Sequence, residues 1–88
     1  MNQLYLYAMN LHILLFGIAS ELININALPI EIQTNSTVSD LKKLLVTKHP
    51  PLEKMSSYAI AVNEAYASNE TVLKENDVVA IIPPVSGG

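Results

Sequence analysis

The chain has 88 residues, half of them hydrophobic and only 15% charged, with five lysines, no arginine and no cysteine. This length allows one small domain, and the missing cysteine excludes a disulfide framework, a thiolate metal site and a cysteine nucleophile. The net charge of −3 leaves no basic stripe for nucleic acid and weakly favours a basic protein partner.

The first residues of the chain combine an apolar stretch with small residues. No positive charge precedes this stretch, as a secretory signal peptide would require, and it is shorter than the roughly 20 apolar residues of a membrane span. We therefore expect a cytoplasmic protein that does not enter a membrane. We interpret residues 1–8 as an N-terminal extension that either precedes the first strand or lengthens it.

The next segments alternate between strand and helix patterns. The apolar run "LHILLFG" (11–17) predicts a strand that ends at a glycine, and "IASELIN" (18–24) predicts a single helical turn. In "LPIEIQT" (28–34), Ile30 and Ile32 alternate with Glu31 and Gln33. This period of two is typical of a half-buried strand.

The segment "STVSDLKKLLVTKHPP" predicts the one long helix of the chain. Thr37, followed three residues later by Asp40, forms a capping-box pattern, and Pro50 and Pro51 prevent the helix from continuing. One face of the helix is apolar and carries Val38, Leu41, Leu44 and Leu45.

The last part of the domain reads as strands: "YAIAVN" (58–63), a short strand around Tyr66, and "VVAII" after the turn pair Asn76-Asp77, which accepts a left-handed conformation. The whole order predicts an α+β domain over residues 9–82, with a mixed sheet of about five strands. One main helix packs on one face of that sheet.

A single helix covers only one face of a sheet, yet "LHILLF" and "VVAII" are apolar at both parities. Strands buried on both faces read as such continuous apolar runs, and no second long helix is available to bury the other face. We therefore expect an open apolar sheet face that binds a protein partner. We assign Phe16, Val79 and Ile81 to that interface, although simple core packing is an equally good interpretation of Phe16.

The chain offers little for independent catalysis. His12 lies inside the first predicted strand and His49 at the end of the helix, without the spacing of a nucleophile and its base. Scattered acids and two histidines form no metal-binding motif, and three glycines cannot build a phosphate-binding loop. We expect no metal and no active site within the domain.

The tail over residues 83–88 ends in two glycines. Pro83 and Pro84 donate no ladder hydrogen bonds, so they end the sheet and direct the remaining four residues outward. Six extended residues span about 20 Å, and glycines without Cβ atoms pass through a narrow channel. The tail therefore suits delivery of the Gly88 carboxylate into another protein's active site.

The segments "LLFGIASEL" and "LKENDVVAIIPPVSGG", with "VN" after the helix, resemble the small-subunit family of molybdopterin synthase, the MoaD type of ubiquitin-like sulfur carrier. The resemblance covers about residues 9 to 88 and is most specific in the ending Pro-Pro-Val-Ser-Gly-Gly. Asn76 stands where the family commonly has glycine, and this change is tolerable because Asn also accepts positive φ.

The resemblance implies a β-grasp fold and a sulfur-donor subunit that binds no cofactor and whose catalytic side chains lie in its partner. An adenylating enzyme uses ATP to join Gly88 to AMP, and a donor such as a cysteine desulfurase or rhodanese then supplies the sulfur of a thiocarboxylate. The tail enters the large subunit of a heterotetramer, where two sulfur transfers convert cyclic pyranopterin monophosphate into molybdopterin. The channel-filling residues would be Pro83, Pro84, Val85, Ser86 and Gly87.

Three other functions are compatible with the sequence. Sulfur carriers for thiamine or for tRNA thiolation share the fold and the Gly-Gly ending but usually lack Pro-Pro-Val-Ser. A ubiquitin-like modifier would instead join Gly88 to lysines through amide bonds. A plain binding module would carry an inert tail.

Overall fold

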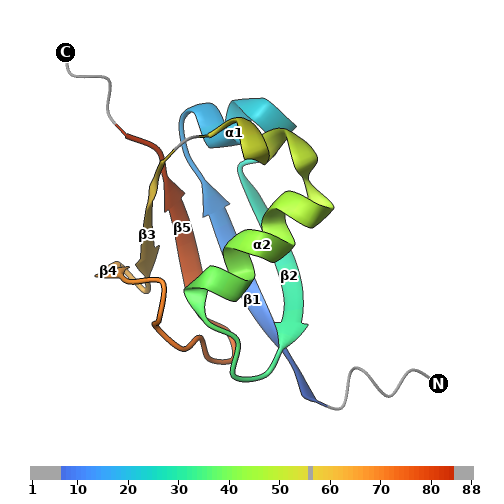
Figure 1. The fold of residues 1–88 in the computed structure, drawn as a ribbon, viewed down its shortest axis with the longest axis vertical. Helices are drawn as coiled ribbons and strands as arrows, with labels where there is room; N and C mark the ends of the chain where they lie inside the picture. The colour runs from blue at the N-terminus through green and yellow to red at the C-terminus, as the bar shows by residue number, and fades with distance from the viewer. Residues whose placement is uncertain (1–6, 56, 85–88) are drawn as a thin grey trace.

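A computed structural model describes residues 7–55 and 57–84 of the chain (Figure 1). The described residues form a five-stranded mixed sheet with the strand order β2-β1-β5-β3-β4. The elements are β1 (Ala8–Leu15), α1 (Ile18–Ile23), β2 (Ala27–Gln33), α2 (Val38–Lys48), the 3₁₀ helix η2 (Pro50–Lys54), β3 (Ala59–Val62), β4 (Ala65–Ala67) and β5 (Val78–Ile82). The predicted α+β architecture with one main helix is confirmed.

Two neighbouring strands at the centre of the sheet run parallel, namely β1 and β5, with Leu14 opposite Ala80. The other pairs, β1 with β2, β3 with β5 and β3 with β4, are antiparallel. Because the carboxyl ends of parallel strands meet at the same edge of a sheet, the turn after β1 and the segment after β5 leave the sheet side by side. Figure 1 shows α1 and the C-terminal end of the described chain at this same end of the molecule.

Helix α2 lies across one face of the sheet (Figure 1). Its N-terminus is the predicted capping box: the Asp40 N–H donates to the Thr37 hydroxyl over 3.2 Å, and the Thr37 N–H donates to the Asp40 carboxylate over 2.9 Å. The backbone N–H and then the hydroxyl of Thr37 stabilise the ionised carboxylate and hold the pKa of Asp40 below its ordinary value. This capping fixes where the helix begins, and so which of its residues face the sheet.

The core lies between α2 and the sheet. Leu11, Ile13, Val38, Leu41 and Leu45 are fully or almost fully buried there, which confirms most of the predicted apolar face of the helix. Leu44 is only partly buried against this cluster.

The outer edge of the sheet at β2 is protected by a proline. Leu15 N–H donates to the Asn26 carbonyl over 2.8 Å, and hydrogen-bonded pairs alternate along an antiparallel ladder. Pro29, opposite His12, therefore occupies a position whose backbone faces the free edge. A proline there removes an outward donor and discourages another chain from adding a strand.

The observed bounds differ from the predicted ones by a few residues. The first strand begins at Ala8, and the final strand has the predicted limits, 78–82. The 3₁₀ helix η2 was not predicted: Pro50 and Pro51 end α2, as expected, and then stand at the start of a new helical turn, where a proline needs no N–H partner. Residues 1–6 of the predicted extension lie outside the described residues. None of the helices in the described ranges is long and apolar enough to span a membrane.

Several turns use left-handed backbone, and two of them adjoin strands β3, β4 and β5. Asn76 has φ 67°, which confirms the left-handed conformation expected for the turn before β5. Asn63 and Glu64 join β3 to β4 with φ 51° and 74°, the pattern of a type I′ hairpin turn. Glycine is strongly favoured at the second of these positions, so Glu64 carries backbone strain.

We expect Glu64→Gly to raise the free energy of unfolding by roughly 0.5–1 kcal/mol, because it relieves the left-handed strain at the cost of some chain entropy. Urea denaturation followed by circular dichroism measures the change. Glu64→Ala is the control, since it removes the charge and keeps the strain. Equal stabilisation by the two variants would show that the carboxylate, and not the backbone, is responsible.

Candidate functional site

The face of the sheet opposite α2 has no helix on it among the described residues, as predicted. The strand register places one cross-strand row on this face: Leu14 is paired with Ala80, Ala80 with Ala61 and Ala61 with Tyr66. Alternate residues of each strand share the face. We call it the open face, and it comprises Ala8, Asn10, His12, Leu14, Ala27, Pro29, Glu31, Gln33, Ala59, Ala61, Tyr66, Val78, Ala80 and Ile82.

The open face is mainly apolar. Small side chains form a flat central area, which we call the floor, and larger side chains surround it as a rim. Ala59, Ala61 and Ala80 form the floor. The rim includes Tyr66, which is 78% exposed, and Val78, which is 38% exposed. Phe16 follows β1 at the same parity and is 50% exposed. Exposed large apolar side chains grouped around one surface usually mark a protein interface.

The assignment of Val79 and Ile81 to the open face is wrong. These residues are 0% and 1% exposed and belong to the core cluster beneath α2. Their neighbours Val78, Ala80 and Ile82 have the outward parity instead. The physical reason is that "VVAII" is apolar at both parities, so the strand itself contains no polar residue to mark the solvent side.

The pattern of β1, which pairs with β5, could have indicated which residues of β5 face outward. Asn10 and His12 are polar and alternate with the buried Leu11 and Ile13, so the even positions of β1 face solvent. Phe16 has this parity, and its exposure agrees with an outward position; its contact with a partner stays a prediction. Tyr66 and Ile82 were not predicted as interface residues.

A glycine turn joins β1 to α1 beside the base of the tail. Gly17 has φ 54° and ψ −131°, a conformation that side chains disfavour strongly, and Ala19 N–H donates across the turn to the Phe16 carbonyl over 3.1 Å. A Cβ atom at Gly17 would lie 3.5 Å from Cγ of Pro83. The turn that exposes Phe16 therefore contacts the first residue of the predicted tail.

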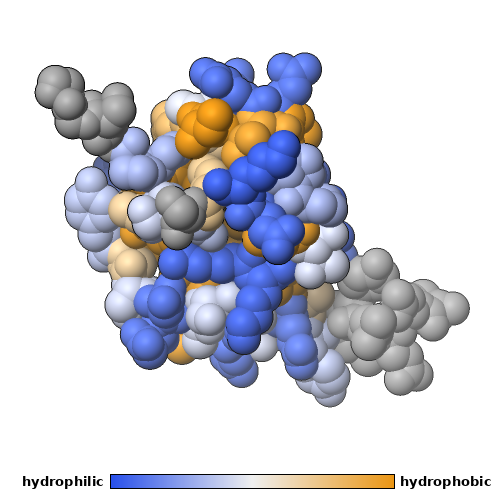
Figure 2. All heavy atoms as spheres, turned by 45° about the horizontal axis from the view of Figure 1, so that its top comes forward, coloured by the Kyte–Doolittle hydropathy of each residue, from blue (hydrophilic) through white to orange (hydrophobic). Residues whose placement is uncertain are grey.

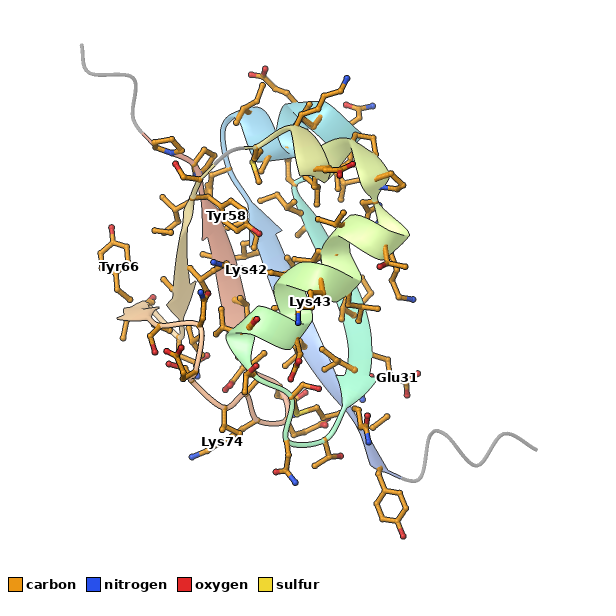
Figure 3. All side chains as sticks on the ribbon, viewed as in Figure 1. Glu31, Lys42, Lys43, Tyr58, Tyr66 and Lys74 are labelled. Carbon is orange, nitrogen blue, oxygen red and sulfur yellow. The ribbon has the colours of Figure 1, made fainter. Side chains whose placement is uncertain are left out.

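A shallow depression of about 380 Å³ adjoins the base of the tail. Its lining is apolar except for hydroxyl groups, and includes Ser57, Tyr58, Ala59, Tyr66, Ile82, Pro83 and Pro84. Burial raises the pKa of the Tyr58 hydroxyl. The ammonium of Lys42 lies 5.0 Å from the centre of the Tyr58 ring, a cation–π distance, and Figure 3 shows the two side chains together beside α2. Tyr66 points away from the body of the molecule at the outer edge of the sheet (Figure 3).

The predicted reactive group lies outside the described residues, as do Val85, Ser86, Gly87 and Gly88. Pro83 is half-buried and Pro84 is exposed. Within residues 7–55 and 57–84, no group of three or more His, Asp or Glu side chains could hold a metal ion. His12 lies exposed on the open face, whereas His49 caps the C-terminus of α2, so the fold does not bring the two histidines together.

The corrected orientation of β5 predicts that substitutions at two neighbouring residues destabilise the fold to very different extents. We expect Val79→Asp to lower the free energy of unfolding by at least about 3 kcal/mol, because it buries a carboxylate without a partner. The matched substitution Val78→Asp, at an exposed position, should cost less than about 1 kcal/mol. Urea denaturation of both variants measures the difference, and similar losses would contradict this assignment of faces.

The sequence is similar to one protein family and to proteins of known name. The model of the ThiS family matches residues 13–88. The molybdopterin synthase sulfur carrier subunit of Drosophila erecta is 42% identical over 82 residues, which cover 90% of this chain and 91% of that protein. The protein of the same name from Arabidopsis thaliana is 35% identical over 92% of this chain and 85% of its own length.

Solved structures share the fold. SAMP1 from Haloferax volcanii has a TM-score of 0.81 at 25% identity, over 90% of this chain and 99% of that one. The small archaeal modifier protein 1 from Methanosarcina acetivorans has a TM-score of 0.78 at 26% identity, over 92% and 98%. In the protein–protein complex of subunits 1 and 2 of the molybdopterin-converting factor from Helicobacter pylori, the matching chain has a TM-score of 0.63 at 28% identity, over 91% and 100%.

Proposed function

The chain belongs to the ThiS family, and from this premise we propose that it is the sulfur carrier subunit of a molybdopterin synthase. The observation that carries the proposal is its identity with molybdopterin synthase sulfur carrier subunits over nearly the full length of both chains. The sequence Pro-Pro-Val-Ser-Gly-Gly directly after β5 supports the same function. The proposal requires Gly88 to carry a free carboxylate in the working protein.

The first step activates that carboxylate, which is a poor electrophile by itself. One carboxylate oxygen of Gly88 attacks the α-phosphorus of ATP on an adenylating enzyme, and pyrophosphate leaves. The product is a mixed anhydride of Gly88 and AMP. This chain would contribute the tail and a docking surface, while the enzyme would bind the nucleotide.

The second step exchanges oxygen for sulfur. The outer sulfur of a persulfide on the donor protein attacks the Gly88 carbonyl, the bond to the phosphate oxygen breaks and AMP leaves. A thiol of the donor or of the adenylating enzyme then attacks the resulting acyl disulfide, forms a disulfide with the donor cysteine and releases Gly88 as a thiocarboxylate. Because the chain contains no cysteine, the sulfur comes from another protein, such as a cysteine desulfurase or a rhodanese. We assign these reactions to the cytoplasm, where ATP and reduced sulfur are both available.

The third step delivers the sulfur. The tail would enter the active site of the large subunit, where the thiocarboxylate sulfur of Gly88 would bond to a carbon of cyclic pyranopterin monophosphate. Water would then hydrolyse the resulting thioester, which leaves the sulfur on the pterin and frees the Gly88 carboxylate for another cycle. Two such transfers supply the two sulfur atoms of the molybdopterin dithiolene. The complex described for Helicobacter pylori, between subunits 1 and 2 of a molybdopterin-converting factor, supports a pairing with a large subunit, and we propose a heterotetramer.

The geometry at the base of the tail supports this mechanism. Pro83 contacts the turn that exposes Phe16, and Tyr66 and Ile82 line the depression beside Pro84. A partner that covers the open face is therefore already placed where the tail leaves the sheet. Exposed aromatic side chains of this kind often contribute a large share of the binding energy at an interface.

A protein modifier is the second candidate, because the fold also matches a small archaeal modifier protein. In that function, the activated Gly88 would form amide bonds with lysines of other proteins. Mass spectrometry separates the two outcomes: a carrier gains one sulfur in place of one oxygen, whereas a modifier leaves Gly-Gly remnants on other proteins.

We expect deletion of Gly88, or addition of one residue after it, to abolish molybdopterin formation in a reconstituted synthase reaction. The reacting carbonyl would then be missing or displaced by one residue, at about 3.3–3.6 Å per residue. The folded domain should keep its thermal stability, since among the described residues neither Pro83 nor Pro84 belongs to the core cluster.

Glu70→Gln, at an exposed position, is the control and should retain full activity. Normal molybdopterin output from the Gly88 deletion would contradict the sulfur carrier function.

A further inference from the structure

The turn at Gly17 exposes two large apolar side chains, not one. Phe16, before the glycine, continues the outward parity of the open face. Ile18, after it, begins α1 and is 47% exposed. Large apolar residues are uncommon at such exposure without a partner when they also line a concave surface, and Ile18 lines one.

Ile18 belongs to a second apolar depression at the base of the tail. This groove has a volume of about 370 Å³ and is lined by Ile18, Leu22, Lys54, Met55, Ser57 and Pro84. It lies between α1 and η2, at the end of the molecule where Figure 2 shows hydrophobic surface gathered among hydrophilic groups. We call it the helical groove.

The helical groove and the depression beside Tyr66 share Ser57 and Pro84. Pro84 is the last described residue of the tail, and it lies between two apolar hollows. Only the hollow beside Tyr66 adjoins the open face. A partner that held the tail through the open face alone would leave the helical groove and Ile18 in water.

The charge of the helical groove indicates what would fill it. Lys54 is the one charged residue among the described residues of its lining, and neither hollow is lined by Asp or Glu, although the chain has eight acidic residues. An aliphatic side chain would match Ile18, Leu22 and Met55, and a neighbouring carboxylate would match the ammonium of Lys54.

We propose that the large subunit of the synthase closes around the base of the tail and inserts an aliphatic side chain, next to a carboxylate, into the helical groove. This inference rests on the proposed function and extends it. The tail would be held from both sides, so that its direction at Pro84 is fixed as it enters the partner. Fixing the tail in this way would reduce the entropy lost when Gly88 reaches the reaction site.

The test compares two substitutions at equally exposed apolar positions. Ile18→Asp places a charge in the helical groove, and an acid in the first turn of a helix does not oppose folding. Val72→Asp is the matched control, because Val72 is 50% exposed and lines neither hollow. We expect Ile18→Asp to raise the dissociation constant for the purified large subunit at least about tenfold. Val72→Asp should change this constant less than about twofold.

A second pair of variants tests the charge. Lys54→Glu should weaken binding several-fold, and the effect should shrink as salt is added because exposed charges are screened. Lys74→Glu is its control, since Lys74 lies at the far end of the molecule (Figure 3). Thermal denaturation verifies that all four variants are folded, and Ile18→Ala replaces Ile18→Asp in the comparison if the latter is not.

The possible outcomes separate this inference from the proposed function. If the wild-type chain binds the large subunit and Ile18→Asp binds as well as Val72→Asp, the helical groove is not an interface and the proposed function stands. If the wild-type chain neither binds the large subunit nor supports molybdopterin formation, the proposed function itself fails. If Ile18→Asp instead abolishes self-association of the chain, the groove joins two copies and the inference is overturned.

Discussion

The sheet is apolar on both faces, but the one main helix covers only one of them. The rest of the structure depends on this difference between the apolar surface of the sheet and the surface that the helix can bury. Helix α2 has 11 residues and is therefore about 16 Å long, enough to cover the centre of one sheet face. The core forms there, from the inward residues of the strands and the buried face of α2, with smaller contributions from α1 and η2. The opposite face keeps Leu14, Val78 and Ile82 without a covering element among the described residues. The partner proposed above would bury that face.

The parallel pairing of β1 with β5 determines where the proposed partner would meet the tail. Because the two strands end at the same edge, the turn after β1 lies against Pro83 at the start of the tail. Gly17 is needed for this contact, since its φ of 54° belongs to a region that residues with a Cβ rarely occupy. Strand pairing and one glycine thus place the exposed Phe16 and Ile18 beside Pro83 and Pro84, the described residues of the tail.

Much of this fold could be predicted from local patterns. The capping box, the alternation of Ile30 and Ile32 with polar residues, and the left-handed turn at Asn76 each determine their own element and were predicted correctly. The orientation of β5 was not, because a uniformly apolar strand gains its parity from its neighbours and not from its own residues. The two hollows could not be predicted at all. They join residues from α1, η2 and β3 to the tail, and these segments are brought together only by tertiary packing.

The shape of the open face fits a surface that is used repeatedly. Three alanines form its floor, and the large side chains stand at its rim, so a partner gains hydrophobic contact from a few residues without deep interlocking. A carrier that is adenylated, sulfurated and then emptied must leave each partner, and an interface that binds too tightly would slow every release. Specificity then has to come from elsewhere. The helical groove, with Lys54 and its own lining residues, offers a second contact that one partner can use and another can leave empty, so that a common docking face still allows partners to be distinguished.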